Sequence, residues 1–454
     1  MEFAWEKRPL RELLRLTWPI ATSLLSYSCM TLVDTLLVGR IGRAEIAGVG
    51  LAGMVAFSLI CFPMGILQGG KTLIAQAVGA RRPEEARAVL GASLASAVGL
   101  GILALLAGQL LAEAAPLLTS TPASGQAART YLRVRSLGAP LVTIFIALRE
   151  WSYAHGRTRP PMVATLAANA CNALLAVLFI YGLGLGVAGA AAATIVAHGV
   201  EVGTLFLLSR KHGLASGRPR RADLVRLWRI GLPSGVQFVL EVGSFTMLSV
   251  LISLMSEVDM AGHQIALQII HFSFLPALAV GEAASVLAGH AIGAGRDWLV
   301  IRVARLALLL ALLYMGCFAL VFLVGAEAIA SRFTRDAQVL ALAVSLLHLA
   351  AAFQLLDAAN VVGRCVLRGT GDVRYAAVIG VASAWLCVPP LTWLLGHRLH
   401  LGARGGWLGI TCEVCCAAAL FWWRLERKGW KPAADRTRRE LERPTGQELA
   451  REVA

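Results

Sequence analysis

Three carboxylates lie inside long apolar stretches of the chain, where an acidic side chain is costly to keep. Asp34, Glu241 and Asp357 each stand within hydrophobic residues that could cross a bilayer as a helix. Ionisable groups in such positions mark ion pathways, substrate pathways or proton relays. A buried carboxylate can contribute to a site for a hard cation such as Na⁺, or it can take up a proton. These acids therefore indicate cation chemistry inside a membrane.

Two of the acids are expected at the same depth. Glu241 follows Arg229 by twelve residues, and Asp357 precedes Arg368 by eleven. At about 1.5 Å per residue, each acid lies about 17 Å from the basic boundary of its helix, near the middle of the bilayer. We therefore expect these two acids to converge.

The third acid is expected in the other half of the bilayer. Asp34 lies nineteen residues beyond Arg15, which corresponds to about 28 Å along a helix. The same estimate from helical rise places Asn172 and Thr194 at intermediate to outer depth, where they could supply neutral oxygens beside Asp34. The alternative, that all three acids pair structurally with nearby bases or amides, stays open at this point.

The elements that position these residues are membrane-spanning helices. Of the 454 residues, 57% are hydrophobic and only 15% are charged, too few to cover a soluble domain of this length. Nothing resembles the alternating strands of an outer-membrane barrel. Breaks between apolar stretches predict an all-α integral membrane fold with twelve spans, at residues 13–38, 44–78, 86–114, 125–150, 160–183, 187–209, 223–254, 259–293, 298–325, 336–367, 373–396 and 405–426.

The net charge of +15 does not indicate nucleic acid, because the basic residues form short clusters between apolar stretches. Most of them lie on the side of the membrane that carries both termini, and far fewer lie in the opposite loops. The positive-inside rule then places both termini in the cytoplasm. The expected organisation is a lead-in at 1–12, an N-lobe at 13–209, a linker at 210–222, a C-lobe at 223–426 and a mobile cytoplasmic tail at 427–454.

The two lobes form an internal repeat. At an offset of 214 residues, Arg15 falls on Arg229, Pro19 on Pro233 and Arg82 on Arg296 without a gap. Six spans per copy give the copies the same orientation in the membrane. Parallel repeats of this kind predict a central cavity between two lobes that rock to open it to either side.

The nine cysteines do not indicate a metal centre. The densest group, Cys412, Cys415 and Cys416, lies in an apolar segment with Glu413 as the only neighbouring acid. Structural zinc needs four converging ligands. We expect these cysteines to act as small apolar residues.

Several segments together resemble the multidrug and toxic compound extrusion (MATE) family. They are Val33-Asp34-Thr35, Ala261-Gly262-His263-Gln264-Ile265-Ala266, Gly293-Ala294-Gly295 and Leu367-Arg368-Gly369-Thr370-Gly371-Asp372-Val373-Arg374. The resemblance covers both halves and is closest to the bacterial norfloxacin-efflux type. It implies roles in cation and substrate binding for Asp34, Glu241 and Asp357, and a place in the N-lobe site for Asn172 and Thr194.

One departure from that pattern weakens the N-lobe site. Ala176 stands one turn after Asn172, where relatives carry Asn or Asp. A full Na⁺ cage in the N-lobe is therefore less expected, and a proton, or a site built on the C-lobe acids, gains weight.

The expected function is export of small organic cations in exchange for Na⁺ or H⁺ by competition at buried carboxylates. The expected protein is a monomer in the cell inner membrane, with no cofactor beyond the coupling ion. Three alternatives stay open. A flippase for a lipid-linked precursor would need a strongly basic cavity, a major-facilitator transporter lacks its Gly/Asp/Arg loop here, and a membrane enzyme would need a catalytic cluster that the sequence does not display.

Overall fold

The computed structural model describes residues 6–119, 121–210, 214, 217 and 219–442, and these residues form helices and connecting turns with no strand among them. The first part of the chain folds into α1 (Pro9–Gly39), α2 (Arg43–Gly79), α3 (Pro83–Ala114), η1 (Ala115–Leu118), α4 (Pro122–Ser136), α5 (Ala139–Ala154), α6 (Arg159–Val177), η2 (Leu178–Gly182) and α7 (Gly186–Arg210). The second part folds into α8 (Arg221–Ser253), α9 (Glu257–Gly293), α10 (Trp298–Ala330), α11 (Ala337–Thr370), α12 (Val373–Leu391), η3 (Thr392–Arg398), α13 (Ala403–Glu426) and α14 (Lys431–Glu442).

The helices confirm the predicted all-α membrane fold. Within the part of the chain that the structure describes, eleven are long and apolar enough to cross a bilayer, and α4 with α5 forms a twelfth candidate that bends by 49°. The predicted span at 125–150 is this bent pair. Pro140, the second residue of α5, lacks the N–H that would bond to the carbonyl of Ser136 and so favours a break there.

The described chain forms two compact units. The C-terminal unit comprises the described residues within 1–21, 75–82 and 237–454, and the N-terminal unit comprises those within 22–74 and 83–236. The predicted lobe boundaries at 13–209 and 223–426 stay a prediction. The predicted linker at 210–222 and tail at 427–454 lie partly outside the described residues.

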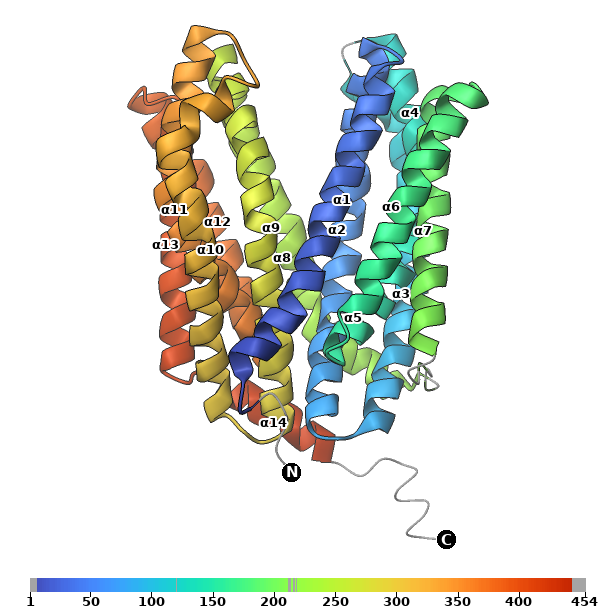
Figure 1. Cartoon of the computed structure of the whole chain (residues 1–454), viewed down its shortest axis with the longest axis vertical. Coiled ribbons are helices and arrows are strands. Elements are labelled where there is room, and N and C mark those ends of the chain that lie inside the picture. The colour runs from blue at the N-terminus through green and yellow to red at the C-terminus, as the bar shows by residue number, and fades with distance from the viewer. Residues whose placement is uncertain (1–5, 120, 211–213, 215–216, 218, 443–454) are drawn as a thin grey trace. The chain divides into compact units, whose positions relative to one another are not determined.

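In the C-terminal unit, α11 packs against α9, α10, α12 and α13 (Figure 1). Its start is fixed by Asp336, whose carboxylate accepts hydrogen bonds from the backbone N–H groups of Gln338 and Val339. Its end is fixed by Gly371, whose φ of 92° lies in the left-handed region that glycine adopts without strain. These two caps set the register of the helix that carries Asp357.

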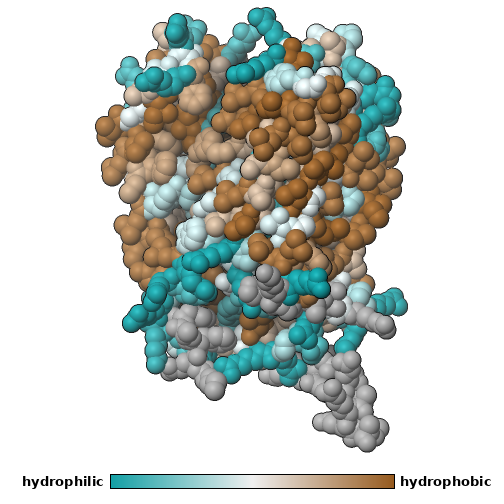
Figure 2. Space-filling model, turned by 45° about the vertical axis from the view of Figure 1, so that its right-hand side comes forward, coloured by the Kyte–Doolittle hydropathy of each residue, from teal (hydrophilic) through white to brown (hydrophobic). Residues whose placement is uncertain are grey.

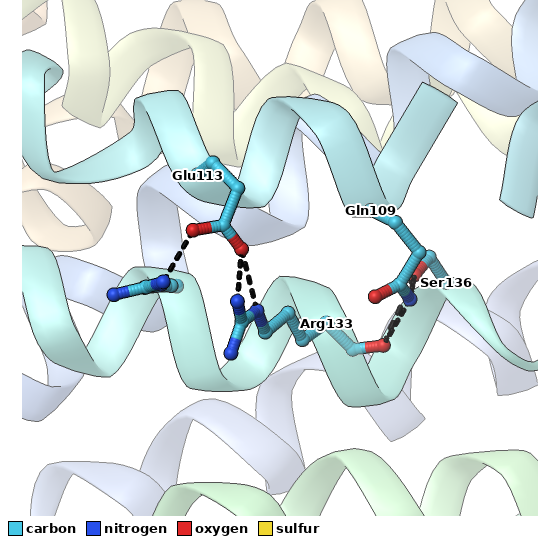
Figure 3. A network of polar contacts seen from close by, with 5 residues as sticks. Gln109, Glu113, Arg133 and Ser136 are labelled. Atoms are coloured by element: carbon cyan, nitrogen blue, oxygen red, sulfur yellow. Dashed lines mark hydrogen bonds and ion pairs between the residues drawn. The ribbon is translucent and has the colours of Figure 1, made fainter. Parts of the chain in front are cut away.

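In the N-terminal unit, an ion-pair cluster joins α3 to α4 (Figure 3). The carboxylate of Glu113 accepts hydrogen bonds from both Arg129 and Arg133, including one of 2.7 Å from Arg133 Nε. One turn earlier on α3, Gln109 Nε2 donates to Ser136 Oγ at 2.7 Å. Together these contacts fix the register of α4 against α3.

The surface agrees with a membrane environment. On the face in Figure 2, hydrophobic residues cover the middle of the molecule, and hydrophilic residues gather toward its two ends. Many large apolar side chains are exposed, such as Leu110, Leu174 and Val324. Exposed apolar surface on this scale is stable only against lipid or a partner.

The prediction of a mobile tail is wrong for residues 431–442, which form α14. The sequence there is polar, but Trp430 and Ala434 are fully buried against the unit. Arg438 of α14 pairs with Asp297 at 2.6 Å, which ties α14 to the start of α10. A single buried tryptophan and an ion pair thus order a segment whose composition favoured disorder.

We expect Trp430→Ala to lower the free energy of unfolding by about 3–5 kcal/mol, because it leaves a large cavity. Thermal unfolding of the purified protein in detergent measures this. Trp423→Ala is the matched control, because Trp423 is exposed on α13. Equal loss in the two variants would contradict a structural role for α14.

Candidate functional site

The predicted acid Glu241, on α8, forms an ion pair inside the C-terminal unit. Arg364 of α11 donates from Nη1 to both oxygens of Glu241, at 3.0 and 3.1 Å. Both side chains are largely buried: 18% of the Glu241 side chain and 15% of the Arg364 side chain are exposed. Glu241 is therefore paired with a base, which is the alternative that the sequence left open.

A second arginine reaches the same acid through an amide. Arg368 Nη2 donates to Gln237 Oε1 at 2.8 Å, and Gln237 Nε2 donates to Glu241 Oε1 at 2.7 Å. Gly380 on α12 makes room for this chain, because a Cβ there would lie 2.4 Å from Gln237 Nε2 and 2.8 Å from Glu241 Oε1. The position of Glu241 thus depends on α8, α11 and α12 together.

Asp357 has a different environment from Glu241. It is buried, with 5% of the residue exposed, and its Oδ1 accepts a hydrogen bond from Asn360 Nδ2 at 3.3 Å. Glu413 of α13 is also buried and accepts from Ser383 Oγ at 3.3 Å. The carboxylates of Glu241, Asp357 and Glu413 all act electrostatically on Arg364. These three acids come from three helices, and we call them, together with Arg364 and Arg368, the C-terminal cluster.

The charge balance of the C-terminal cluster favours a cation. With all groups ionised, three carboxylates face two guanidinium groups and leave one net negative charge. Buried charge of one sign is expensive unless a counter-ion or a proton neutralises it. The cluster can therefore accept one monovalent cation or one proton.

The N-terminal unit holds a smaller polar group around Asp34 of α1. Thr194 Oγ1 of α7 donates to Asp34 Oδ2 at 3.5 Å, and Asn172 Nδ2 of α6 donates to Thr194 Oγ1 at 3.3 Å. The structure thus brings together the three predicted residues. Within the described residues, buried Asp34 Oδ1 and Asn172 Oδ1 have no hydrogen-bond partner. Two unpartnered acceptor oxygens fit a bound Na⁺ or a proton on the carboxylate.

A basic residue also stands beside this group. Arg135 of α4 acts electrostatically on Asp34 and contacts His198 Nε2 at 3.1 Å. His198 Nδ1 in turn lies 3.1 Å from Glu201, which accepts a 2.8 Å bond from Thr165. The chain Arg135–His198–Glu201–Thr165 is buried polar structure that holds the arginine near Asp34.

Sequence reasoning misplaced the basic residues near both groups. The depth estimate uses Arg368 as the basic boundary of its helix, whereas the Arg368 side chain, like that of Arg364, points into the C-terminal cluster. Lys71 is another buried basic residue, and its Nζ lies 3.8 Å from Glu150 Oε2. Long cationic side chains can reach several residues along a helix, so position in the sequence does not locate the charge. No pattern in the sequence singled out Arg135.

Two further expectations concern Ala176 and the cysteines. Ala176 is fully buried one turn from Asn172 and adds no ligand atom, in line with the reduced N-lobe site. Cys412 and Cys416 converge with Cys387 rather than with Cys415, and the three sulfur atoms lie within 4.8 Å of one another. The side chains are half-buried or exposed on α12 and α13.

The geometry defines a polytopic membrane protein with buried charges, and sequence comparisons place it in a family. The family model MatE matches residues 19–178 and 233–394, and these matches start 214 residues apart, the same offset as the internal repeat. The chain therefore belongs to the MATE family.

Relatives match along most of the chain. It is 31% identical over 440 residues to the probable multidrug resistance protein NorM of Pseudomonas putida, covering 92% of this chain and 95% of that protein. It is 32% identical over 446 residues to the NorM of Pseudomonas aeruginosa, covering 92% and 90%.

Solved structures share the fold. An outward-facing multidrug resistance MATE family transporter superposes with a TM-score of 0.87 at 22% identity, over 94% of this chain and 96% of that one. The eukaryotic MATE transporter AtDTX14 superposes with a TM-score of 0.87 at 20% identity, over 96% and 99%. These likenesses support the twelve-span fold.

We expect Gly380→Ala to disrupt the C-terminal cluster, because the new methyl group would collide with Gln237 and Glu241. Overpacking of this kind costs about 1–3 kcal/mol. Thermal unfolding in detergent and dye efflux both measure the effect. Gly316→Ala is the control, since its Cβ would meet only Leu355 at 3.8 Å. A stable, active Gly380→Ala variant would contradict the packed arrangement.

Proposed function

We propose that this protein is a transporter that exports small organic cations in exchange for Na⁺ or H⁺. The single observation that carries the proposal is the composition of the C-terminal cluster, where three acids outnumber two arginines. The names of the NorM relatives, which are called multidrug resistance proteins, support drug-like compounds as substrates. We propose transport without a chemical step.

In the proposed cycle, Arg364 occupies the place of a cation when the site is empty. An incoming organic cation competes with Arg364 for Glu241 and Asp357, and apolar walls bind its rings or alkyl groups. Na⁺ or H⁺ then neutralises the acids in the other conformation, and the organic cation leaves. Exchange follows because each cation binds one of two conformations more tightly.

Asp34 supplies a second position for the coupling ion in this proposal. The unpartnered oxygens of Asp34 and Asn172 are suitable acceptors for Na⁺, and Asp34 is equally suitable for a proton. Both lobes would rock around a central cavity, as parallel repeats do in other transporters. We further propose that the protein acts as a monomer in the cytoplasmic membrane with both termini in the cytoplasm.

A second candidate is transport of an anionic cargo, such as a lipid-linked precursor. The observation that favours it is the inward position of Arg364 and Arg368. The buried Nε of Arg364 has no hydrogen-bond partner among the described residues and could donate to an anion. The net charge of the C-terminal cluster opposes this candidate, because an anion would add to the excess of carboxylates.

We expect the double variant Glu241→Gln/Asp357→Asn to reduce ethidium efflux to the background of cells that lack the transporter. The substitutions keep the shape of the side chains and remove the charge that balances a cation. Efflux from everted vesicles, with the Na⁺ and H⁺ gradients collapsed in turn, measures the effect and identifies the coupling ion.

The matched control is Glu257→Gln/Glu327→Gln, which removes two exposed acids from the same unit and should leave efflux unchanged. Equal expression of both variants excludes a folding effect. Parental efflux by Glu241→Gln/Asp357→Asn would overturn the mechanism, and faster export of an anionic dye by that variant would favour the second candidate.

A further inference from the structure

A basic and apolar cavity lies at the start of α1, away from the C-terminal cluster. Its volume is about 840 Å³, and α1 and α10 both contribute to it. Lys7 and Arg8, just before α1, and Arg11, in its first turn, line it from one side. Arg302 and Arg305 line it from α10. All these residues belong to the C-terminal unit.

The charge around this cavity is strongly positive. Its lining contains five cationic side chains and no acid among the described residues. Arg305 pairs with Glu426 at 2.8 Å, so one of these charges is balanced from outside the lining. Like charges around one cavity repel, and a bound anion would relieve that repulsion. A negatively charged occupant would balance this excess of positive charge.

The remaining wall of the cavity is apolar. Trp298 and Leu309 are 59% and 55% exposed, and both line it. Leu309 follows Arg302 by seven residues, which places it about 10 Å further along α10. The cavity thus runs from a ring of cations toward the apolar part of the helix. An indole beside cations is typical of the membrane–water interface.

These two features together select one kind of ligand. A free phosphate or a nucleotide would satisfy the cations but leave the apolar wall in contact with water. A neutral or zwitterionic lipid would cover the apolar wall but leave the excess positive charge. A lipid with a negatively charged phosphate headgroup and an acyl chain satisfies both parts, and basic pockets at the membrane surface bind such headgroups.

We propose that the cavity between the start of α1 and α10 binds an anionic phospholipid. Its phosphate contacts Arg8, Arg11 and Arg302, and an acyl chain lies along Trp298 and Leu309. Bound there, the lipid contacts both the first turns of α1 and α10. It thereby stabilises the position of the start of α1 at the membrane surface. The proposal does not depend on which compound the protein transports.

Native mass spectrometry of the purified protein in detergent tests the proposal. The probes are phosphatidylglycerol and phosphatidylcholine with identical acyl chains, with glycerol phosphate as the soluble headgroup. The test variant is Arg8→Gln/Arg11→Gln/Arg302→Gln. The control variant, Arg40→Gln/Arg332→Gln/Arg335→Gln, removes three exposed arginines that do not line the cavity.

We expect preferential retention of phosphatidylglycerol, reduced at least about tenfold in the test variant and unchanged in the control. The fluorescence of Trp298 reports on the site separately. Phosphatidylglycerol with brominated chains should quench tryptophan fluorescence in the parent, and this quenching should be lost in Trp298→Phe. Equal retention of the two lipids, or equal loss in both triple variants, would overturn the proposal. So would displacement of the lipid by glycerol phosphate, because the site would then bind free phosphate. The single variant Arg302→Gln repeats the test if the triple variant fails to fold.

Discussion

The ion pair between Arg364 and Glu241 is the interaction on which the C-terminal unit depends. A lone carboxylate or guanidinium at this depth would pay a large desolvation cost, and the pair reduces the cost for both groups. The pair does not balance the site, because Asp357 and Glu413 bring further negative charge toward the same arginine. The cluster thus combines one ion pair with two further acids. The competition that we propose requires both the ion pair and the excess of acids.

The two units use similar chemistry at positions that are not equivalent in the repeat. At the offset of 214 residues, Asp34 corresponds to Leu248, and Glu241 corresponds to Tyr27. Each unit nevertheless places an acid near an arginine, Asp34 near Arg135 and Glu241 near Arg364. The repeat thus determines the helices, whereas the charged residues differ between the copies. This asymmetry is compatible with separate roles for the two sites.

The fold could be predicted from the sequence because membrane helices depend on local properties. Length, hydropathy and breaks between apolar stretches locate each span to within a few residues, as for α9 at Glu257–Gly293 against the predicted 259–293. The bend between α4 and α5 is favoured by Pro140, and a proline inside an apolar stretch is itself a local signal for a helix break. The helix α14 was missed because its order depends on the burial of Trp430, a tertiary contact.

The candidate sites were only partly predictable. Asp34, Asn172 and Thr194 were placed together correctly because the helical rise per residue gives a good estimate of depth in the membrane for short side chains. The same estimate failed for the charged groups of Arg364 and Arg368, because an arginine side chain extends far from its backbone and can point along the helix in either direction. The grouping of Glu413 with Asp357 could not be derived either, since it depends on which faces of α11 and α13 meet. Orientation of long side chains is therefore the information that the structure adds.

Competition between cations at the acids is the central claim, and equilibrium binding tests it most directly. Binding of ethidium to the purified protein would be titrated at several pH values and Na⁺ concentrations, for the parent and for Glu241→Gln/Asp357→Asn. The account predicts that ethidium affinity falls as Na⁺ or acidity rises, and that the variant binds weakly and without this dependence. Ethidium affinity in the parent that is insensitive to both Na⁺ and pH would contradict the account.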